Sequence, residues 1–526
     1  MTNETIYDAI TDVSDEWIEE AERHTFRKRP QWKRFAAIAA VVALIFGALG
    51  AAAGRLANLS AGASGGKGNA GGEDGYSYMN YIGPVLPLTA ASDAAGIAAE
   101  RSVDYDFSPY ISREVPFSPE ARAEGDPYSY FAYQSEAIVT DDYTLRNETD
   151  EERTLSLLYP VELRFTDSLN RLPTITVDGE VRETALHAAP YSGGFADAWG
   201  GSNPGARLNL EQISDWRGYV NLLEDGSYQA AAFEPYPALD VPVTVYRVDD
   251  YAVAPTDAVN PSLQIAFTVD PDRTAVMTYG SNGGTNDART GRYTRIVGGL
   301  ANTGAYRPGP MYIILYGDDI GGYTLQGYAN MGGNEGEEID VAAEVTRYET
   351  TLDAILRRIV AERFDERRNT EDVFGGDNIA AVVPEETLYG MAADLLVRYG
   401  VLSDDPAERY DFGMLEDVFE AYSMQRVIYL AFDATVPARG SVRVSASMHK
   451  DNSCDYIGKK KNVDGYDLAT RLGSTLNFTE QRASVSHTEE IRIVENNFGF
   501  DLDAGITQVA LDPAAEHYWM QIAKAP

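Results

Sequence analysis

The sequence predicts an α+β protein, with one N-terminal transmembrane helix followed by a β-sandwich-rich extracytoplasmic region that contains a helical insertion. Three observations predict this class. Residues 35–53 form one uncharged apolar run, residues from 128 onward alternate apolar and polar side chains between turn signals, and residues 346–424 show helical apolar spacing. We therefore expect six regions, which are residues 1–34, 35–53, 54–84, 128–345, 346–424 and 425–526.

The apolar run from Phe35 to Ala53 has the length of a membrane span. At about 1.5 Å per residue it approaches the roughly 30 Å hydrocarbon core of a bilayer. A secretory signal has a shorter apolar centre that begins closer to the N-terminus, which favours a retained anchor. Cleavage after the small residues Ala51–Ala53 remains the alternative. A buried soluble helix is disfavoured because the run is apolar on every side.

Positive charge predicts how the span is oriented. Cationic flanks tend to stay in the cytoplasm. The span is preceded by Arg27, Lys28, Arg29, Lys33 and Arg34, whereas only Arg55 and Lys67 follow it at a comparable distance. We expect a single-pass protein of the cell membrane with a cytoplasmic N-terminus and an extracytoplasmic C-terminus, because no second apolar run of spanning length follows.

Charge and cysteine content limit the partners and the compartment. The chain has 81 acidic and 43 basic residues, and residues 1–34 hold eight and six of these, which leaves a net charge of about −36 beyond them. Such a field repels nucleic acid, so we expect no nucleic-acid partner. A single cysteine, Cys454, excludes an internal disulfide, and this suits a Gram-positive bacterial surface better than an exported eukaryotic protein.

Residues 1–34 are patterned as a cytosolic amphipathic helical head. Apolar residues recur at helical spacing opposite an acidic face, and they are Ile6, Ile10, Val13, Trp17 and Ile18. Ser14 suits the N-cap of the second of two short helices. Because helices this short are marginal alone, we expect the apolar residues to bind a partner. The alternative is an inert membrane-proximal helix.

The segment "IYDAITDVSDEWIEEA", with the basic patch and the single span after it, resembles the cytosolic heads of single-pass proteins of clostridial-type Gram-positive bacteria, some of them anti-sigma-factor-like. The resemblance covers residues 1–55 and implies that the head docks a cytosolic regulator such as a sigma factor. The zinc-containing class of anti-sigma factors is excluded, because the head has only His24 and no cysteine as metal ligands.

The chain beyond the span begins with a Gly-, Ser- and Ala-rich segment, residues 54–84, which predicts a flexible linker. In the β-rich region 128–345, Asp178 and Gly179 predict a tight hairpin turn. An inserted helix there would be capped by Ser214 and ended by Gly226. Residues 346–424 predict helices, and 425–526 a C-terminal β-rich domain.

Stretches such as "YTLRNETDEERTLSLLYP", "YTLQGYAN" and "NNFGFDLDAGITQVALD" resemble an uncharacterised family of membrane-anchored clostridial proteins. That resemblance implies architecture and location, and it brings no catalytic residue to this chain.

The sequence nominates no catalytic, cofactor-binding or metal-ligating residue. Its histidines, His24, His187, His449, His487 and His517, are scattered and show no H-E-x-x-H spacing. No G-x-S-x-G elbow is present. Cys454 has lysines nearby that could lower the pKa of its thiol, and the alternative is a loop cysteine without a role.

Three further patterns have a functional and an ordinary interpretation. Acidic pairs at Asp270/Asp272 and Asp501/Asp503 could begin calcium loops, although turn chemistry explains them better. The 33 tyrosines suit a carbohydrate- or peptide-binding face, or ordinary strand positions. Five arginines between residues 357 and 368 could bind a ligand, although ion pairs with Asp353, Glu362 and Glu366 on the same helix are favoured. They are Arg357, Arg358, Arg363, Arg367 and Arg368.

The leading hypothesis is a single-pass membrane protein that presents a β-rich extracytoplasmic module and signals to a cytosolic regulator such as a sigma factor. The partners expected are the lipid bilayer, through residues 35–53, and that regulator, at the head. The alternative is an extracytoplasmic binding or scaffold protein with an inert head, whose ligand would be cell-wall carbohydrate or peptide. A cell-surface hydrolase is a third, less favoured hypothesis, and no cofactor is expected.

Overall fold

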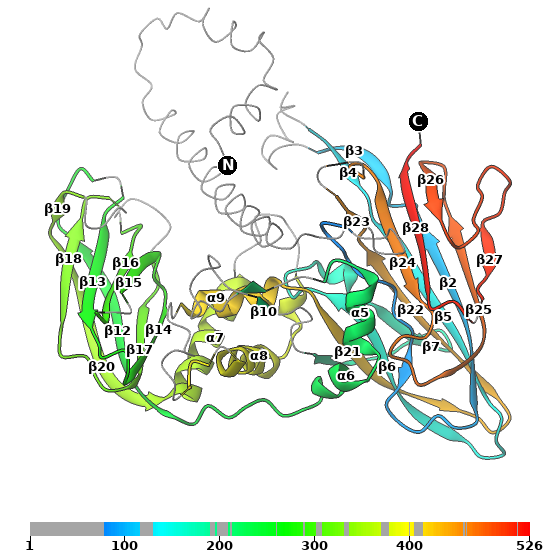
Figure 1. Cartoon of the computed structure of the whole chain (residues 1–526), viewed down its shortest axis with the longest axis horizontal. Helices are drawn as coiled ribbons and strands as arrows, with labels where there is room; N and C mark the ends of the chain where they lie inside the picture. The colour runs from blue at the N-terminus through cyan, green and yellow to red at the C-terminus, as the bar shows by residue number, and fades with distance from the viewer. Residues whose placement is uncertain are drawn as a thin grey trace, which may run out of the picture. The chain divides into compact units, whose positions relative to one another are not determined.

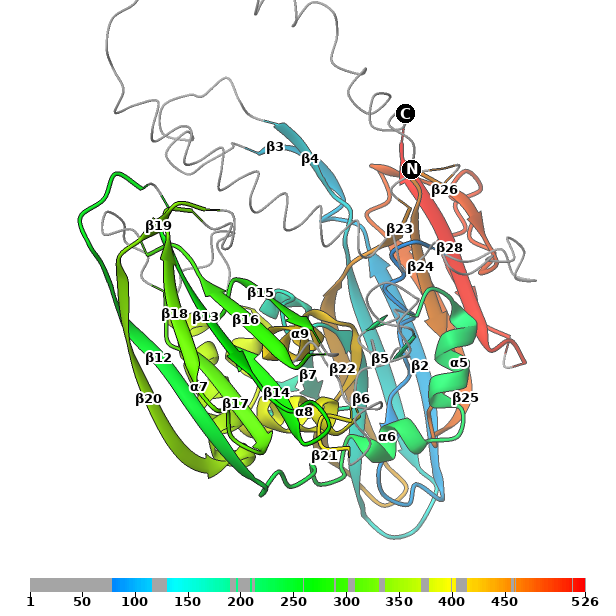
Figure 2. The ribbon, with the colours of Figure 1, turned by 60° about the vertical axis from the view of Figure 1, so that its left-hand side comes forward.

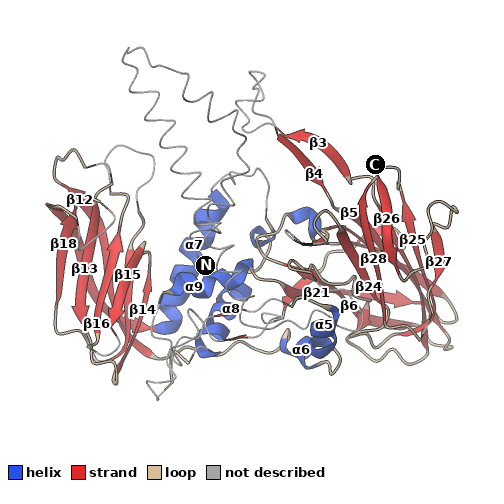
Figure 3. Ribbon diagram, turned by 45° about the horizontal axis from the view of Figure 1, so that its top comes forward, coloured by secondary structure: helices blue, strands red, loops and turns tan. Residues whose placement is uncertain are grey.

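The computed structural model describes residues 78–115, 130–189, 195–196, 209–210, 213–258, 260–287, 290–300, 308–330, 336–369, 378–398, 400–403, 414–455, 458, 460–512 and 514–525. These residues are mostly β, as predicted, and strands dominate Figure 3. In the part of the chain that is described, no helix is both long and apolar enough to cross a bilayer. The predicted head 1–34 and span 35–53 lie outside the described residues.

Three sheets form what we call the major β region. The first has the strand order β27 (Gln508–Ala510), β25 (Asn477–Ser486), β2 (Ile97–Asp106), β5 (Ala137–Asn147), β22 (Ser441–Lys450), β7 (Thr174–Val177) and β8 (Glu180–Val181). The second is β1 (Thr89–Ala90), β6 (Arg153–Leu163), β21 (Arg426–Val436) and β9 (Ala185–Ala188). The third is β23 (Ser453–Cys454), β24 (Asp464–Ala469), β28 (His517–Lys524) and β26 (Ile491–Asn496). Buried side chains from all three sheets form one core.

Residues 78–88, which we call the strap, join the second sheet to the third. The strap continues into β1, which pairs antiparallel with β6. On its other side, the Val85 amide donates to the Asp467 carbonyl at 2.9 Å and the Ala469 amide donates to the Val85 carbonyl at 3.1 Å. Residues 78–84, which the sequence predicted as the end of the linker, are instead part of the strap. Tyr78 and Tyr81 are 2% and 1% exposed, because their aromatic side chains belong to a separate buried cluster that includes Leu158 and Tyr219.

Strands from the two ends of the described chain alternate within the major β region. β21 pairs with β6 along its whole length, and β22 pairs with β5. β25 runs parallel to β2. In Figure 1 the orange and red strands accordingly lie among the blue and cyan ones. The predicted C-terminal domain 425–526 is therefore not separate, because its strands β21 and β22 share sheets with residues 137–163.

The predicted strands around "RNETDEE" are β5 and β6, and they belong to different sheets. β5 alternates buried and partly exposed residues, whereas β6 is buried at every position from Leu157 to Leu163. The turn between them therefore carries the chain from one layer to the other instead of closing a hairpin.

A second set of strands forms the minor β region. One sheet has the order β14 (Thr274–Tyr279), β17 (Met311–Gly317), β12 (Pro242–Val253) and β20 (Val341–Thr351). The other is β15 (Gly283–Asp287), β16 (Arg292–Val297), β13 (Ser262–Thr268), β18 (Tyr323–Tyr328) and β19 (Glu338–Ile339). Side chains from both sheets share a separate core. Two further two-stranded sheets pair β3 (Ile111–Val115) with β4 (Tyr130–Gln134) and β10 (Phe195–Ala196) with β11 (Asn209–Leu210).

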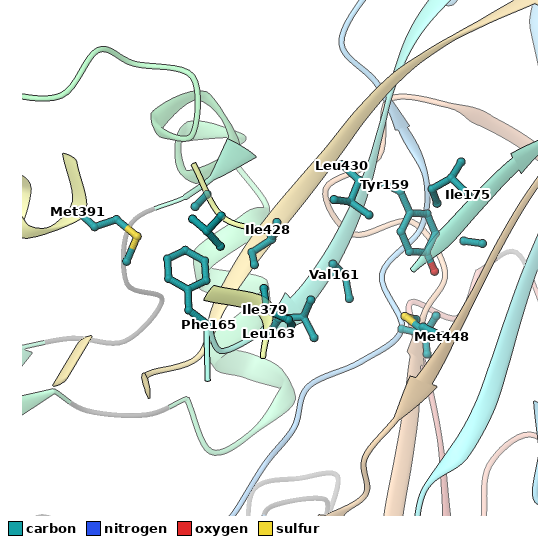
Figure 4. Packing of buried hydrophobic residues seen from close by; sticks show 14 of the residues in the cluster. Tyr159, Val161, Leu163, Phe165, Ile175, Ile379, Met391, Ile428, Leu430 and Met448 are labelled. Carbon is teal, nitrogen blue, oxygen red and sulfur yellow. The ribbon is translucent and has the colours of Figure 1, made fainter. Parts of the chain in front are cut away.

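The helices are α5 (Trp216–Leu223), α6 (Ser227–Ala231), α7 (Leu352–Asn369), α8 (Glu385–Arg398) and α9 (Leu415–Glu420). β17 shows how α7 and α8 are placed, because Ile313 and Leu315 face the core of the minor β region while Tyr312 and Ile314 pack with the helices. Figure 2 shows α7 and α8 beside the sheet that contains β17. On the other side, Phe165, Ile379 and Ile428 meet in Figure 4 and continue the core into the major β region.

Two local predictions can be compared with the structure. The hairpin turn is confirmed, because Asp178 and Gly179 have φ values of 52° and 84° and connect β7 to β8. The inserted helix is also present, but its N-cap is Asp215, whose carboxylate accepts from the Gly218 amide at 2.9 Å. Ser214, the predicted cap, instead offers its carbonyl to the Tyr78 amide.

Candidate functional site: buried ionisable groups at the strap

Ionisable side chains gather where the strap crosses between β6 and β24. Asp467, on β24, is fully buried and accepts hydrogen bonds at Oδ2 from the Tyr81 hydroxyl and from His517 Nε2, the latter at 3.0 Å. Trp216, at the start of α5, stacks on the His517 ring with centroids 4.2 Å apart. The strap, two strands and one helix thus enclose this carboxylate.

Glu162 lies on β6 beside the same segment. Its side chain is 0% exposed, and Lys450 Nζ, on β22, is 3.7 Å from Glu162 Oε2. Lys450 Nζ also donates to the Ile82 carbonyl at 3.4 Å. The Glu162 carboxyl packs against the backbone of Gly83, where an added Cβ would be 1.6 Å from Oε2.

Burial sets the protonation tendency of Glu162. It raises the pKa of Glu162 well above the usual value, and this outweighs the opposite effects of Lys450 and of the Tyr219 hydroxyl. Among the described residues, neither carboxyl oxygen has a donor in hydrogen-bonding geometry, since both Lys450 and Tyr219 approach without achieving it. We conclude that the neutral carboxylic acid is favoured at this position.

A second buried network lies beside the first. Arg101 donates to both carboxylate oxygens of Asp141 at 2.9 and 2.8 Å and to the Ala469 carbonyl at 2.6 Å. Tyr143 donates to Asp141 and accepts from the Leu88 amide of the strap. Every charge here is matched by hydrogen bonds, which is the arrangement expected of a structural ion pair.

A small cavity opens next to Glu162 and Lys450. Its volume is about 20 Å³, and its lining includes Ile82, Gln425 and His449 besides the acid and the amine. This is room for one water molecule. The cavity is too small for an organic substrate, so the site offers an acid, an amine and a water-sized space.

A shallow hollow of about 450 Å³ lies on the minor β region. Phe267, Arg292 and Tyr323 line it, and Tyr323 is 40% exposed. It is open to solvent, so it is better suited to binding one face of a larger ligand than to enclosing a substrate for a reaction.

The predicted partner-binding residues Ile6, Ile10, Val13, Trp17 and Ile18, and the cationic residues from Arg27 to Arg34, lie outside the described residues. Like the head, His24 lies outside the described residues, and the remaining four histidines have four different partners. His517, His449 and His487 contact Asp467, Glu136 and Asp106 respectively, and His187 stacks on Phe233. Within the described residues, no three His, Cys, Asp or Glu side chains are placed to hold a metal.

Cys454 does not have the activated environment that its lysine neighbours suggested. It lies on β23, and burial raises the pKa of its thiol, with nearby acidic groups acting in the same direction. These surroundings disfavour the thiolate and do not support the reactive-cysteine interpretation.

The ordinary interpretations of the acidic pairs and of two arginines are confirmed. Asp270 and Asp501 accept hydrogen bonds from amides two and three residues further along the chain, as turn residues do. Arg357 and Arg358 pair with Asp353 and Glu362 on α7. The side chains of Arg367 and Arg368 lie outside the described residues.

Many tyrosines are core residues, so tyrosine content does not by itself mark a binding face. Fully buried examples are Tyr81, Tyr105, Tyr143, Tyr159, Tyr219, Tyr312 and Tyr466.

Sequence reasoning missed Glu162, Lys450 and Asp467. A signal was present for Glu162, because it interrupts the apolar run "LLYPVELRF", and a charge inside a fully buried strand must find a partner. Nothing in the sequence brings residues 162 and 450 together. No protein-family model, curated protein or solved structure matches the chain.

Proposed function

We propose that this chain is a single-pass membrane protein that presents a β-sandwich-rich module outside the cell and links its state to a cytosolic regulator bound by the head. The observation that carries this proposal is the order of segments. The apolar residues 35–53 follow a cationic cluster, and a Gly-rich segment then leads directly into the strap at Tyr78. One continuous segment of chain thus joins the strap to the proposed span.

Topology is tested on the full chain with a reporter that is active only outside the cell, fused at either end. We expect activity from the C-terminal fusion alone, and the chain should remain in membranes after an alkaline wash. Release into the medium of a product that begins near residue 54 would contradict retention, and recovery in the cytosol would contradict the span.

The regulator is tested in full-length variants of the head. Ile10→Ser with Trp17→Ser should abolish co-purification of a sigma factor and change envelope-stress transcription, because the sequence predicts that these side chains lie on the apolar face. Asp15→Ser, on the acidic face, is the matched control. If the double variant co-purifies with the sigma factor and supports transcription as the Asp15→Ser control does, the head is inert.

The hollow at Phe267, Arg292 and Tyr323 favours a second candidate, a module that binds cell-wall carbohydrate or peptide. An exposed tyrosine beside an arginine offers a ring face and donors to such a ligand. Tyr323→Ala should reduce co-sedimentation of the full chain with purified cell wall, while Val181→Ala, on the exposed β8, should not. Equal sedimentation of both variants with the unchanged chain would count against this site.

A further inference from the structure

Glu162 and Lys450 face each other in an arrangement that an ordinary ion pair does not explain. A charge-assisted bond between an ammonium and a carboxylate has a separation of about 2.7–2.9 Å. Here Lys450 Nζ and Glu162 Oε2 are 3.7 Å apart, with side chains 7% and 0% exposed. Among the described residues no hydrogen bond reaches the Glu162 carboxyl, so the buried ammonium of Lys450 faces a group that does not compensate its charge.

We propose that Glu162 and Lys450 are joined by an intramolecular amide bond between Lys450 Nζ and Glu162 Cδ. The bond would remove the buried ammonium charge and, at the same time, the buried carboxyl that lacks a hydrogen bond from the described residues. It would also tie β6 to β22, strands of two different sheets whose side chains share one core.

The condensation balances without an oxidant or a co-reactant. The Nζ–Cδ bond forms, the bond between Cδ and the hydroxyl oxygen of Glu162 breaks, and one water molecule leaves. The acid enters in its neutral form, in keeping with the raised pKa of Glu162. The cavity beside both groups has the volume of the departing water.

In this proposal Asp467 takes the ammonium proton of Lys450. It is fully buried and close enough to Glu162 to act on the pKa of that carboxyl. Its Oδ1 has no hydrogen-bond partner among the described residues, while Oδ2 is held by Tyr81 and His517. The Lys450 nitrogen gives up two protons as the amide forms. The first passes through Asp467 and His517 to the surface, and the second goes to the leaving hydroxyl, which departs as water. Asp467 therefore acts as a proton carrier in this step.

The strap backbone at Ile82 and Gly83 forms another side of this site. Gly83 has a φ of 79° and leaves no room for a Cβ against the Glu162 carboxyl. The strap thus presses the carboxyl into place, and the Ile82 carbonyl accepts a hydrogen bond from Lys450 Nζ. A chain with one cysteine gains in this way a covalent cross-link between distant residues that needs no disulfide.

The test is the mass of the full chain, purified from membranes in detergent and then denatured. We expect a mass one water molecule below that of the sequence, and a protease digest that yields a branched peptide joining residues 162 and 450. The full sequence mass would overturn the proposal. So would loss of water mapped elsewhere, for example at the Asp178–Gly179 or Asp464–Gly465 pairs, which can cyclise.

Variants assign the roles. Lys450→Met should restore the full sequence mass, whereas Lys461→Met should retain the loss of one water. Asp467→Asn should leave residues 162 and 450 unjoined for much longer after synthesis, and resistance of the folded variant to protease shows that the strap is still packed. Formation of the bond at the unchanged rate in Asp467→Asn would overturn the role of Asp467.

Discussion

Arg101 shows how a buried charge in the major β region is stabilised. Its guanidinium pairs with both oxygens of Asp141, and both side chains are 0% exposed. Such a pair gains little over an apolar pair, but loss of one partner leaves a charge without compensation. The position is structural for this reason.

Arg101→Met should lower the free energy of unfolding by about 3–5 kcal/mol, because Asp141 remains buried without its partner. Denaturant titration of the full chain measures this change in the free energy of unfolding. The matched control is Arg146→Met, whose pair with Glu100 is exposed and should contribute about 0–1 kcal/mol. Equal effects of the two variants would show that the Arg101 pair is not buried in solution.

Cys454 should react slowly with iodoacetamide. Burial raises the pKa of its thiol, so the thiolate, which is the nucleophile, is scarcer than in an exposed cysteine at the same pH. Because the chain has one cysteine, the mass gained by alkylation with time at mildly alkaline pH gives the rate directly. The same chain in denaturant should react faster. A folded chain that reacts as fast as the denatured one would contradict this.

At the scale of elements, the N-cap of α5 is Asp215 in the structure, whereas the sequence predicted Ser214. Asp215→Ala should lower the free energy of unfolding by about 1 kcal/mol, because the Gly218 amide loses its acceptor. Ser214→Ala should have little effect, since only the backbone carbonyl of Ser214 is used. Thermal unfolding of the full chain distinguishes the two, and the reverse order of effects would restore Ser214 as the cap.

The strap depends on a glycine. Gly83→Ala should destabilise the strap more than Gly179→Ala destabilises its turn. Both residues have left-handed φ values, 79° and 84°, and each substitution costs about 1–2 kcal/mol for that reason. Only at Gly83 does a Cβ meet another side chain, and the extra overpacking costs roughly 1–3 kcal/mol. Denaturant titration compares them, and equal losses would mean that Glu162 moves aside freely.

At the scale of the whole molecule, the two ends of the described chain share sheets. A chain that stops at residue 425 lacks β22 and β21, which pair with one edge of β5 and of β6 respectively, so the ladder groups and apolar faces along those edges would be exposed. We expect it to show no cooperative unfolding transition and to be degraded by protease under conditions that the full chain resists. A protease-resistant shortened chain would show instead that residues 78–425 fold independently.

The sequence predicted the features that local chemistry controls. The tight turn at Asp178 and Gly179 follows from the positive φ that a two-residue hairpin loop requires. The helix at residues 216–223 follows from apolar spacing, although its cap is Asp215 rather than Ser214. It ends at Leu223, while Gly226 precedes the next helix. Strand texture likewise follows from alternation, which is a property of neighbouring residues.

The sequence did not predict the candidate site, because Glu162, Lys450 and Asp467 are brought together by strand pairing between distant residues. β5 and β6 are adjacent in the chain but lie in different sheets, whereas β6 and β21 are distant in the chain and pair directly. Such choices depend on which apolar faces can be covered together, and that information belongs to the assembled core.

By itself, the sequence determined that the described chain is mostly β, where its tight turns lie, and that it has no cysteine pair for a disulfide. Only the tertiary structure decided that residues 78–88 join two sheets and that an acid and an amine, 288 residues apart in the chain, meet at a buried position. The physical reason is that composition and periodicity act over a few residues, whereas burial of a charge is a property of everything packed around it.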